Sequence, residues 1–160
     1  MRQTVYIETS VISYLAARTS RDLIVAGHQQ ITQDWWDTRQ QWDIYVSALV
    51  VNEVGFGDLD AASQRLAVIE NIPALAVDAA AVSLARQLLM EAALPEKAQE
   101  DALHIAVAAV NGIDYLLTWN CTHIANAVKR PLIMAICEAA GYRPPVICTP
   151  EELLGAAHVE

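Results

Sequence analysis

The sequence contains few basic side chains. Among its 160 residues, 10 are Lys or Arg and 19 are Asp or Glu, which gives a formal net charge of −9. Proteins that hold nucleic acid through a broad basic face neutralise many phosphates, so this balance argues against such a face. It leaves open an enzyme that reaches phosphate groups through metal ions.

Cysteines and targeting signals are also scarce. Cys121, Cys137 and Cys148 form no CxxC pair and lack the spacing of a zinc site, which favours a reduced compartment. Residues 1–5 lack the apolar run of a signal peptide. The Ala-rich stretches meet polar residues before they reach the roughly 20 residues that a bilayer span needs. We therefore expect a cytoplasmic protein without a membrane segment.

Glycine-rich phosphate loops and catalytic serine motifs are absent as well. No segment reads GxGxxG, GxxxxGKS/T or GxSxG, which argues against nucleotide-cofactor enzymes, P-loop ATPases and α/β-hydrolases. Hydrophobic residues make up 54% of the chain and aromatic residues only 6%, so the core is expected to consist largely of Ala, Val, Leu and Ile. Length and composition predict a single domain over residues 1–160.

What is present is an alternation of short apolar runs and helical stretches. The predicted strands are residues 4–7, 44–46, 75–77, 115–118 and 146–148; the predicted helices are 22–41, 48–54, 61–69 and 99–110, with others beginning after Ser10 and Asp78. Strands separated by helices form βαβ units. The chain is therefore predicted to have an α/β fold with three layers, in which helices cover both faces of a central parallel sheet.

Two features of the helices lead to further predictions. One apolar stripe is expected in the helix after Asp78, made of Val82, Ala85, Leu89 and Ala92. Trp35, Trp36 and Trp42 gather near the end of helix 22–41, and since adjacent tryptophans cannot share one helix face, at least one is expected to point away from the core. Base stacking and burial against the sheet stay open, and a protein interface is the interpretation we favour.

Acidic side chains follow several predicted strands. Glu8 comes directly after the first strand, Glu53 lies on the helix after the second, and Asp101 lies in the first turn of helix 99–110. Thr118 and Asn120 stand at the end of the fourth strand. Because ligands of open α/β sheets bind outside the carboxyl ends of the strands, these oxygen-bearing side chains are expected at one sheet edge.

A divalent cation would reconcile these acids with one another. Asp101 has apolar neighbours on its helix and no obvious Lys or Arg partner, although a carboxylate in such surroundings needs one. Glu8, Glu53 and Asp101 would repel one another if they met unneutralised. Oxygen ligands without Cys or clustered His select Mg²⁺ or Mn²⁺ over zinc. Singly, a helix cap, a solvated glutamate and a helix-start charge are simpler interpretations, but chance must then bring all three to one edge.

Two histidines lie near these acids in the sequence. His104, three residues after Asp101, is a candidate for polarising that acid or contacting phosphate; a hydrogen-bonded structural histidine is the interpretation we favour. His123 follows Asn120 closely, and for this side chain a position in the cleft and a plain loop role stay equally open.

Four segments, in this order, resemble the motifs of one known family. They are VYIETS at 5–10, Glu53, EDALHIA at 100–106 and LTWN at 117–120. Together they resemble PIN-domain ribonucleases, above all the VapC-like toxins of bacterial toxin–antitoxin pairs, over residues 5–146. The resemblance implies a PIN-like three-layer fold and a Mg²⁺- or Mn²⁺-dependent endoribonuclease that hydrolyses RNA phosphodiester bonds. It also implies an antitoxin partner and a homodimer.

The resemblance assigns roles by position. The candidates for catalysis are Glu8, Glu53, Asp101, Asn120 and Thr118, of which the first three would bind the metal; those for substrate contact are Ser10, His104 and His123. Two positions depart from the family, because Glu8 replaces the usual Asp and Asn120 stands where many members have a fourth Asp. The site would then hold one cation well and a second one weakly. The alternative is a catalytically weak or inactive PIN-like module that binds nucleic acid or protein.

Overall fold

The computed structural model of the chain describes residues 1–91 and 94–156. Its strands are β1 (Thr4–Ile7), β2 (Asp43–Ser47), β3 (Ala74–Leu75), β4 (Tyr115–Leu117) and β5 (Val146–Cys148). Its helices are α1 (Thr9–Ala16), α2 (Leu23–Asp37), α3 (Ala48–Val54), α4 (Leu59–Ile69), α5 (Ala79–Met90), α6 (Gln99–Val110), α7 (Arg130–Ala139) and α8 (Pro150–Ala156). Two short 3-10 turns, η1 (Arg39–Gln41) and η2 (Glu96–Ala98), precede β2 and α6.

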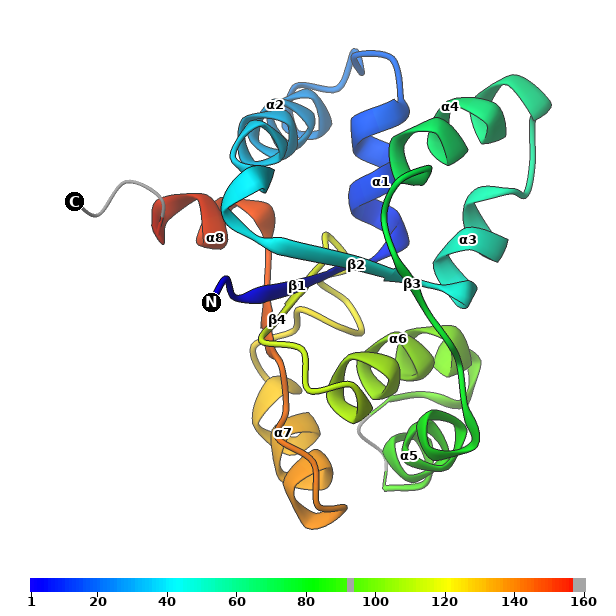
Figure 1. Cartoon of the computed structure of the whole chain (residues 1–160), viewed down its shortest axis with the longest axis vertical. Helices are drawn as coiled ribbons and strands as arrows, with labels where there is room; N and C mark the ends of the chain where they lie inside the picture. The colour runs from blue at the N-terminus through cyan, green and yellow to red at the C-terminus, as the bar shows by residue number, and fades with distance from the viewer. Residues whose placement is uncertain (92–93, 157–160) are drawn as a thin grey trace.

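The five strands form one parallel sheet in the order β3-β2-β1-β4-β5. β1 is the central strand, and its Tyr6 is paired with Tyr45 on one side and Leu116 on the other. The chain builds outward from β1 to β3 and then crosses to β4 on the opposite side of β1 (Figure 1). Strand order therefore reverses between β1 and β4, which is where open α/β sheets form their binding crevice.

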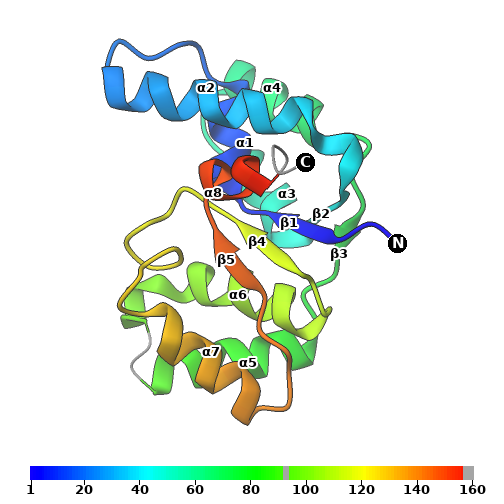
Figure 2. The same cartoon turned by 90° about the vertical axis from the view of Figure 1, so that its left-hand side faces the viewer.

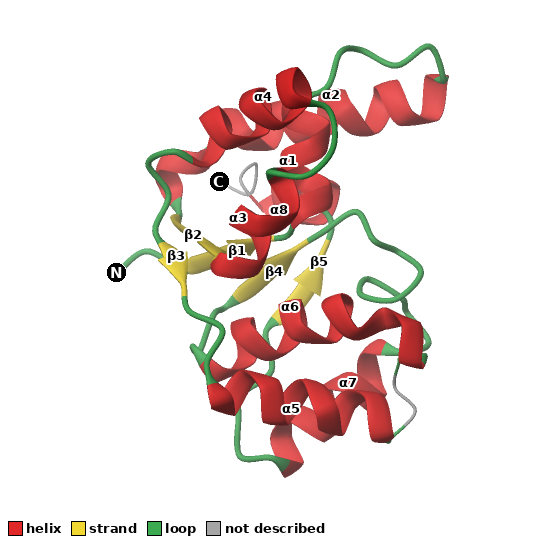
Figure 3. Cartoon of the chain, turned by 90° about the vertical axis from the view of Figure 1, so that its right-hand side faces the viewer, coloured by secondary structure: helices red, strands yellow, loops and turns green. Residues whose placement is uncertain are grey.

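Helices cover both faces of this sheet. α1, α2, α3, α4 and α8 lie on one face, and α5, α6 and α7 lie on the other (Figure 2, Figure 3). The predicted three-layer α/β fold with a central parallel sheet is thereby confirmed. In the part of the chain that the structure describes, no helix combines the length and the apolar character needed to cross a bilayer.

Local signals explain where most helices begin. The side chains of Asp22, Ser47, Asp58 and Asp78 each accept a hydrogen bond from a backbone N–H in the first turn of the helix that follows. Such caps satisfy donors that the helix itself leaves unpaired. Ser47 has two positions at once, because it is the last residue of β2 and the N-cap of α3. After α6 the chain turns at Gly112, whose φ of 65° favours glycine.

The structure corrects several predicted boundaries and adds two helices. β3 covers only two residues, α2 ends at Asp37 rather than at 41, and α7 and α8 were not predicted. The apolar stripe predicted for α5 is wrong. Its buried residues are Ala81, Leu84, Ala85 and Leu88, whereas Val82 is exposed, Leu89 is half-buried and Ala92 lies outside the described residues. The helix has apolar residues at adjacent positions, so the helical period alone fits two overlapping stripes.

The three tryptophans near the end of α2 all contact the core. Trp35 is fully buried, and Trp36 and Trp42 are partly buried against the core. The ring of Trp42 meets Tyr115 edge-on with centroids 5.7 Å apart, and the Arg39 guanidinium lies 4.8 Å from the centre of the Trp36 ring. The expectation that one of them points away from the core is wrong, because α2 packs against both α1 and α8 and so has more than one covered face.

Asp114 connects the beginning of β1 to the turn before β4. Its Oδ2 accepts hydrogen bonds from the backbone N–H of Thr4 at 2.9 Å and from the Thr4 hydroxyl at 3.1 Å. Its Oδ1 accepts hydrogen bonds from the exposed guanidinium of Arg143 at 3.1 Å. The Thr4 backbone hydrogen bond, helped by Arg143, lowers the pKa of Asp114. The ionised carboxylate is therefore favoured in the folded state.

Replacing Asp114 with Ala should lower the free energy of unfolding by about 1–2 kcal/mol at neutral pH, because two donors of Thr4 lose their acceptor. Since the pKa of Asp114 is lowered on folding, its stabilisation is complete above the ordinary carboxyl range and is lost as pH falls through the lowered value. Urea unfolding over a series of pH values measures both effects. The control Arg143→Ala removes an exposed ion pair and should cost less than about 1 kcal/mol. A deficit in Asp114→Ala that stays constant into strong acid contradicts the role of the carboxylate.

Candidate active site

Glu8 lies where β1 meets α1 and is held by two neighbouring segments. It is the N-cap of α1, and its Oε2 accepts the backbone N–H of Ser10 at 3.0 Å and a short hydrogen bond from the Ser10 hydroxyl. The same oxygen accepts the hydroxyl of Thr118 at 2.8 Å. The side chain is largely buried. The helix-cap interpretation of Glu8 is therefore confirmed, and the cap is also linked to the segment after β4.

Thr118, Trp119 and Asn120 follow β4 and join it to the end of β1. The Thr118 hydroxyl accepts the backbone N–H of Asn120 at 2.9 Å while it donates to Glu8. The backbone N–H of Trp119 donates to the Ser10 hydroxyl oxygen at 2.9 Å. The buried Thr118 hydroxyl thus both donates and accepts a hydrogen bond within the protein. This favours a role in positioning Glu8 over the orientation of water or phosphate that we expected from the sequence.

Glu53 reaches the same edge from α3. Its Oε1 accepts the Thr9 hydroxyl at 2.7 Å and lies 2.7 Å from Nε2 of His104 on α6. Burial raises the pKa of Glu53, but the hydrogen bond and charge of His104, together with the Thr9 hydroxyl, outweigh burial and lower it. Glu53 is therefore ionised and fixed by two other elements, which excludes the interpretation of a freely solvated side chain.

Asp101 has two protein partners that the sequence did not reveal. Its Oδ1 accepts the side-chain amide of Asn120 at 3.0 Å, and its Oδ2 lies 2.8 Å from Nδ1 of His123. The backbone N–H of His123 in turn donates to the Asn120 carbonyl oxygen at 3.1 Å. His123 thus lies in the site and orients Asp101. The carboxylate is satisfied without Lys or Arg, so its lack of a basic partner does not by itself require a cation.

All three acids act on one buried imidazole. Burial lowers the pKa of His104, but its hydrogen bond to Glu53 and the charges of Glu8, Glu53 and Asp101 outweigh burial and raise it. Acids that come from the ends of three different segments therefore converge around His104. The structure brings all eight residues predicted for the site to this edge of the sheet. They are Glu8, Ser10, Glu53, Asp101, His104, Thr118, Asn120 and His123.

His104 itself cannot contact substrate. Its exposed fraction is 1%, and it lies in the core below the acids. The predicted substrate contact is wrong, and the hydrogen-bonded structural histidine that the sequence favoured is correct. Its carboxylate partner is Glu53 rather than the nearby Asp101.

The donor set suits a hard cation, although the carboxylates are turned to other partners. All candidate ligands are oxygens, as Mg²⁺ and Mn²⁺ prefer. Glu8 directs Oε2 to Ser10 and Thr118, and Glu53 directs Oε1 to Thr9 and His104. Within residues 1–91 and 94–156, no three Asp, Glu, His or Cys side chains are grouped tightly enough to hold one ion. Each carboxylate faces its own hydrogen-bond donor instead.

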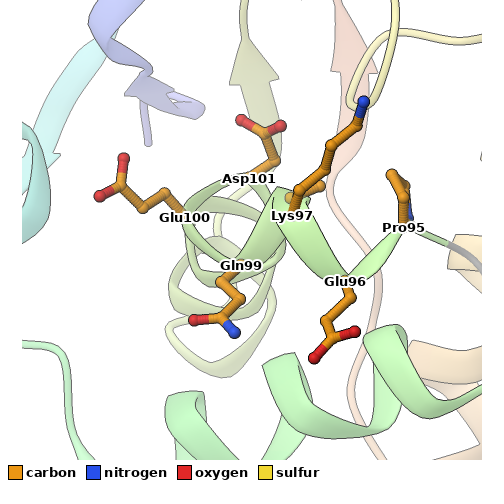
Figure 4. A pocket seen from close by; sticks show the side chains of 7 residues that line it. Pro95, Glu96, Lys97, Gln99, Glu100 and Asp101 are labelled. Atoms are coloured by element: carbon orange, nitrogen blue, oxygen red, sulfur yellow. The ribbon is translucent and has the colours of Figure 1, made fainter.

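A groove of about 770 Å³ opens at the beginning of α6, beside Asp101. Pro95 to Asp101 line it, and Figure 4 shows Glu100, Asp101 and Lys97 extending toward the sheet side of this groove while Gln99 and Glu96 extend away. Glu53, as a hydrogen-bond partner and a like charge, raises the pKa of Glu100. The groove therefore brings a fourth acid and one lysine to the margin of the site.

Sequence reasoning missed the side chains that support the site. Tyr6, Thr9, Ser47 and Glu100 all take part in its hydrogen bonds or charges. Trp119 stacks on His28 of α2 with ring centroids 4.2 Å apart, and its indole N–H donates to the buried Thr32 hydroxyl at 2.7 Å. This packing fixes the segment between Thr118 and Asn120. The position of Tyr6 inside the apolar run of β1, where residues 5–7 are all buried, could have indicated a hydroxyl that needs a partner, whereas nothing in the sequence pairs Trp119 with α2.

The chain matches no family model, and no curated protein shows significant sequence similarity to it.

Replacing Thr118 with Val should destabilise the protein by about 1–3 kcal/mol, because the Glu8 carboxylate and the Asn120 N–H both lose a buried partner. Thr118→Ser is the matched control, since it keeps the hydroxyl and loses only a methyl group. Urea unfolding of both variants gives the comparison. Equal stability of the two variants would show that the hydroxyl does not hold Glu8.

Proposed function

We propose that this chain is a Mg²⁺- or Mn²⁺-dependent endoribonuclease that hydrolyses RNA phosphodiester bonds. The convergence of Glu8, Glu53 and Asp101 around His104, next to the point where strand order reverses, is the observation that supports it most strongly. Each acid is held at this edge of the sheet by a hydrogen bond from another segment, which fixes the position of all three carboxylates. Acids gathered in this way are typical of sites that hold a hard dication.

Glu8, Glu53 and Asp101 are the residues that would hold the metal. When bound, a divalent cation of this kind lowers the pKa of a coordinated water and neutralises charge on a phosphate. Oε1 of Glu8 and Oε2 of Glu53 would be the ligating oxygens, since their other oxygens stay with Thr118, Ser10, Thr9 and His104. Asn120 and His123, which follow β4, orient Asp101 through one hydrogen bond to each of its carboxylate oxygens.

The charge of the protein restricts how RNA is held. With 19 acidic and 10 basic residues, the chain repels a polyanion over most of its surface. Lys97 in the groove beside Asp101 offers one local positive charge at the margin of the site. The proposed substrate contact is therefore short, with few phosphates engaged, and binding should depend only weakly on salt concentration.

The biological setting that we propose follows from the resemblance of the four sequence segments to VapC-like toxins. In that setting the protein acts in the cytoplasm, forms a homodimer and is inhibited by an antitoxin protein. The PIN-like fold is compatible with the three-layer architecture and the parallel sheet.

A second candidate function is a catalytically weak or inactive module that binds nucleic acid or protein. It is favoured by Asp101, both of whose oxygens already have hydrogen-bond partners within the protein. The replacement of an acid by Asn120 points the same way. In such a module the hydrogen bonds of the site would serve the fold alone.

Cleavage of a single-stranded RNA in the presence of Mn²⁺ tests the nuclease directly. Glu53→Gln and Asp101→Asn should each reduce the cleavage rate by more than about 100-fold, because each removes a charged ligand while keeping the shape of the side chain. The matched control is Asp34→Asn, an exposed residue of α2 that is bonded only to Gln30 among the described residues, and its rate should be unchanged. Full activity in Asp101→Asn would overturn the assignment of the site.

Thermal unfolding with and without Mn²⁺ separates the two candidate functions. A cation that binds only the folded protein adds about 2.7 kcal/mol when its concentration is 100 times Kd, so the melting temperature of the enzyme should rise. Asp101→Asn should lose most of this rise, and Asp34→Asn should keep it. An inactive module without a metal site should melt at the same temperature in Mn²⁺ and in EDTA.

A further inference from the structure

A chain of hydrogen bonds runs through the core below the acids. Nε2 of His104 lies 2.7 Å from Glu53 Oε1, and its Nδ1 lies 2.7 Å from the Tyr6 hydroxyl. The Tyr6 hydroxyl lies 2.8 Å from the Ser47 hydroxyl, which accepts the backbone N–H of Val50 at 3.2 Å. These polar side chains come from α6, β1 and the end of β2, and His104, Tyr6 and Ser47 are all buried.

The donor at the Glu53 end of this chain is fixed. The ionised Glu53 carboxylate can only accept, so Nε2 of His104 carries a proton and donates it to Oε1. At the other end the Val50 N–H can only donate, so the Ser47 oxygen accepts it, and the Ser47 and Tyr6 hydroxyls share a further hydrogen bond. Burial raises the pKa of Tyr6, so its phenol stays protonated between Ser47 and Nδ1 of His104. Every polar group in the chain is satisfied in this arrangement.

A buried chain of polar side chains contributes less to stability than apolar side chains would in the same place. Each buried hydroxyl or imidazole loses its hydration, and its hydrogen bonds only offset that loss. Apolar residues of similar size would fill the same space between β1 and α6 without this cost. The one group at the end of the chain that reaches the surface is Glu53, which is 21% exposed. At this end the chain acts on Glu53, and at its other end Ser47 caps α3, the helix that carries Glu53.

We propose that Tyr6 and Ser47, acting through His104, are positioning residues that fix the orientation of Glu53 as a metal ligand. The Tyr6 hydroxyl holds the imidazole at Nδ1, so that its Nε2–H holds Oε1 of Glu53 and Oε2 faces the proposed cation. This inference rests on the proposed function, because it assigns the support of one ligand in the same site. Hydrogen-bond partners of metal ligands commonly contribute about 10–100-fold to metal affinity.

The test compares substitutions that keep or remove the hydrogen bond to Glu53 and the hydrogen bond to Tyr6. His104→Gln carries an amide near the position of Nε2 and keeps a donor for Glu53, whereas the shorter His104→Asn reaches toward Tyr6 and leaves Glu53 without its donor. Tyr6→Phe removes the hydroxyl from an otherwise unchanged ring. Tyr115→Phe is the matched control, because it makes the same change on the neighbouring strand, where the hydroxyl has no hydrogen bond with a described residue.

Titration calorimetry with Mn²⁺ gives the dissociation constant, and urea unfolding of each variant reports its stability. We expect His104→Asn to weaken Mn²⁺ binding by about 10–100-fold and Tyr6→Phe by about 10-fold, with His104→Gln and Tyr115→Phe close to the unaltered protein. A purely structural histidine would lower the stability of both His104 variants without separating their Mn²⁺ affinities. If His104→Asn does not fold, unchanged binding in Tyr6→Phe overturns the inference alone. Failure of the unaltered protein to bind Mn²⁺ overturns the proposed metal site together with it.

Discussion

The hydrogen bonds that hold three carboxylates at one edge of the sheet are the interactions on which the candidate site depends. Glu8, Glu53 and Asp101 come from separate segments, and the donor that holds each acid lies outside the acid's own segment. Thr118 holds Glu8, His104 holds Glu53, and Asn120 holds Asp101. Thr118 and Asn120 carry no charge, so these two donors orient Glu8 and Asp101 without cancelling their negative charge. The result is a preorganised cluster of oxygens, and the hydrogen bonds that orient it also join β1, α3, α6 and the segment after β4.

Sheet order explains why these particular segments meet. Because β1 lies between β2 and β4, the residues that follow all three strands share one edge. Glu8 and Thr118 follow adjacent strands at the point where the order reverses, and α6 brings Asp101 to the same edge from the opposite face of the sheet. A different strand order would separate the acids even if every strand and helix were unchanged. The site therefore depends on topology more than on any one motif.

Local patterns in the sequence were enough for most of the elements and insufficient for their contacts. The bounds of β1, α3 and α6 and the start of α5 after Asp78 agree with prediction, because strand runs, turn residues and capping side chains act over a few positions. Partners across the fold were not predictable in this way. His104 is bonded to Glu53, 51 residues away, and not to Asp101 on its own helix, because the side chain turns inward to the sheet. The packing of the tryptophans was missed for the same reason, since α8 was not predicted at all.

The buried chain from Ser47 to Glu53 bears on the choice between an enzyme and an inactive module. Tyr6, Ser47 and His104 occupy the middle of the core, where an apolar side chain would be the more stable choice. Polar groups of this kind are retained where a particular orientation is needed, and here the orientation concerns one oxygen of one carboxylate. A module that used its surface only for binding would gain nothing from fixing that oxygen. The buried chain thus favours the proposed enzyme over the inactive module, and its members Tyr6, Ser47 and His104 are themselves buried.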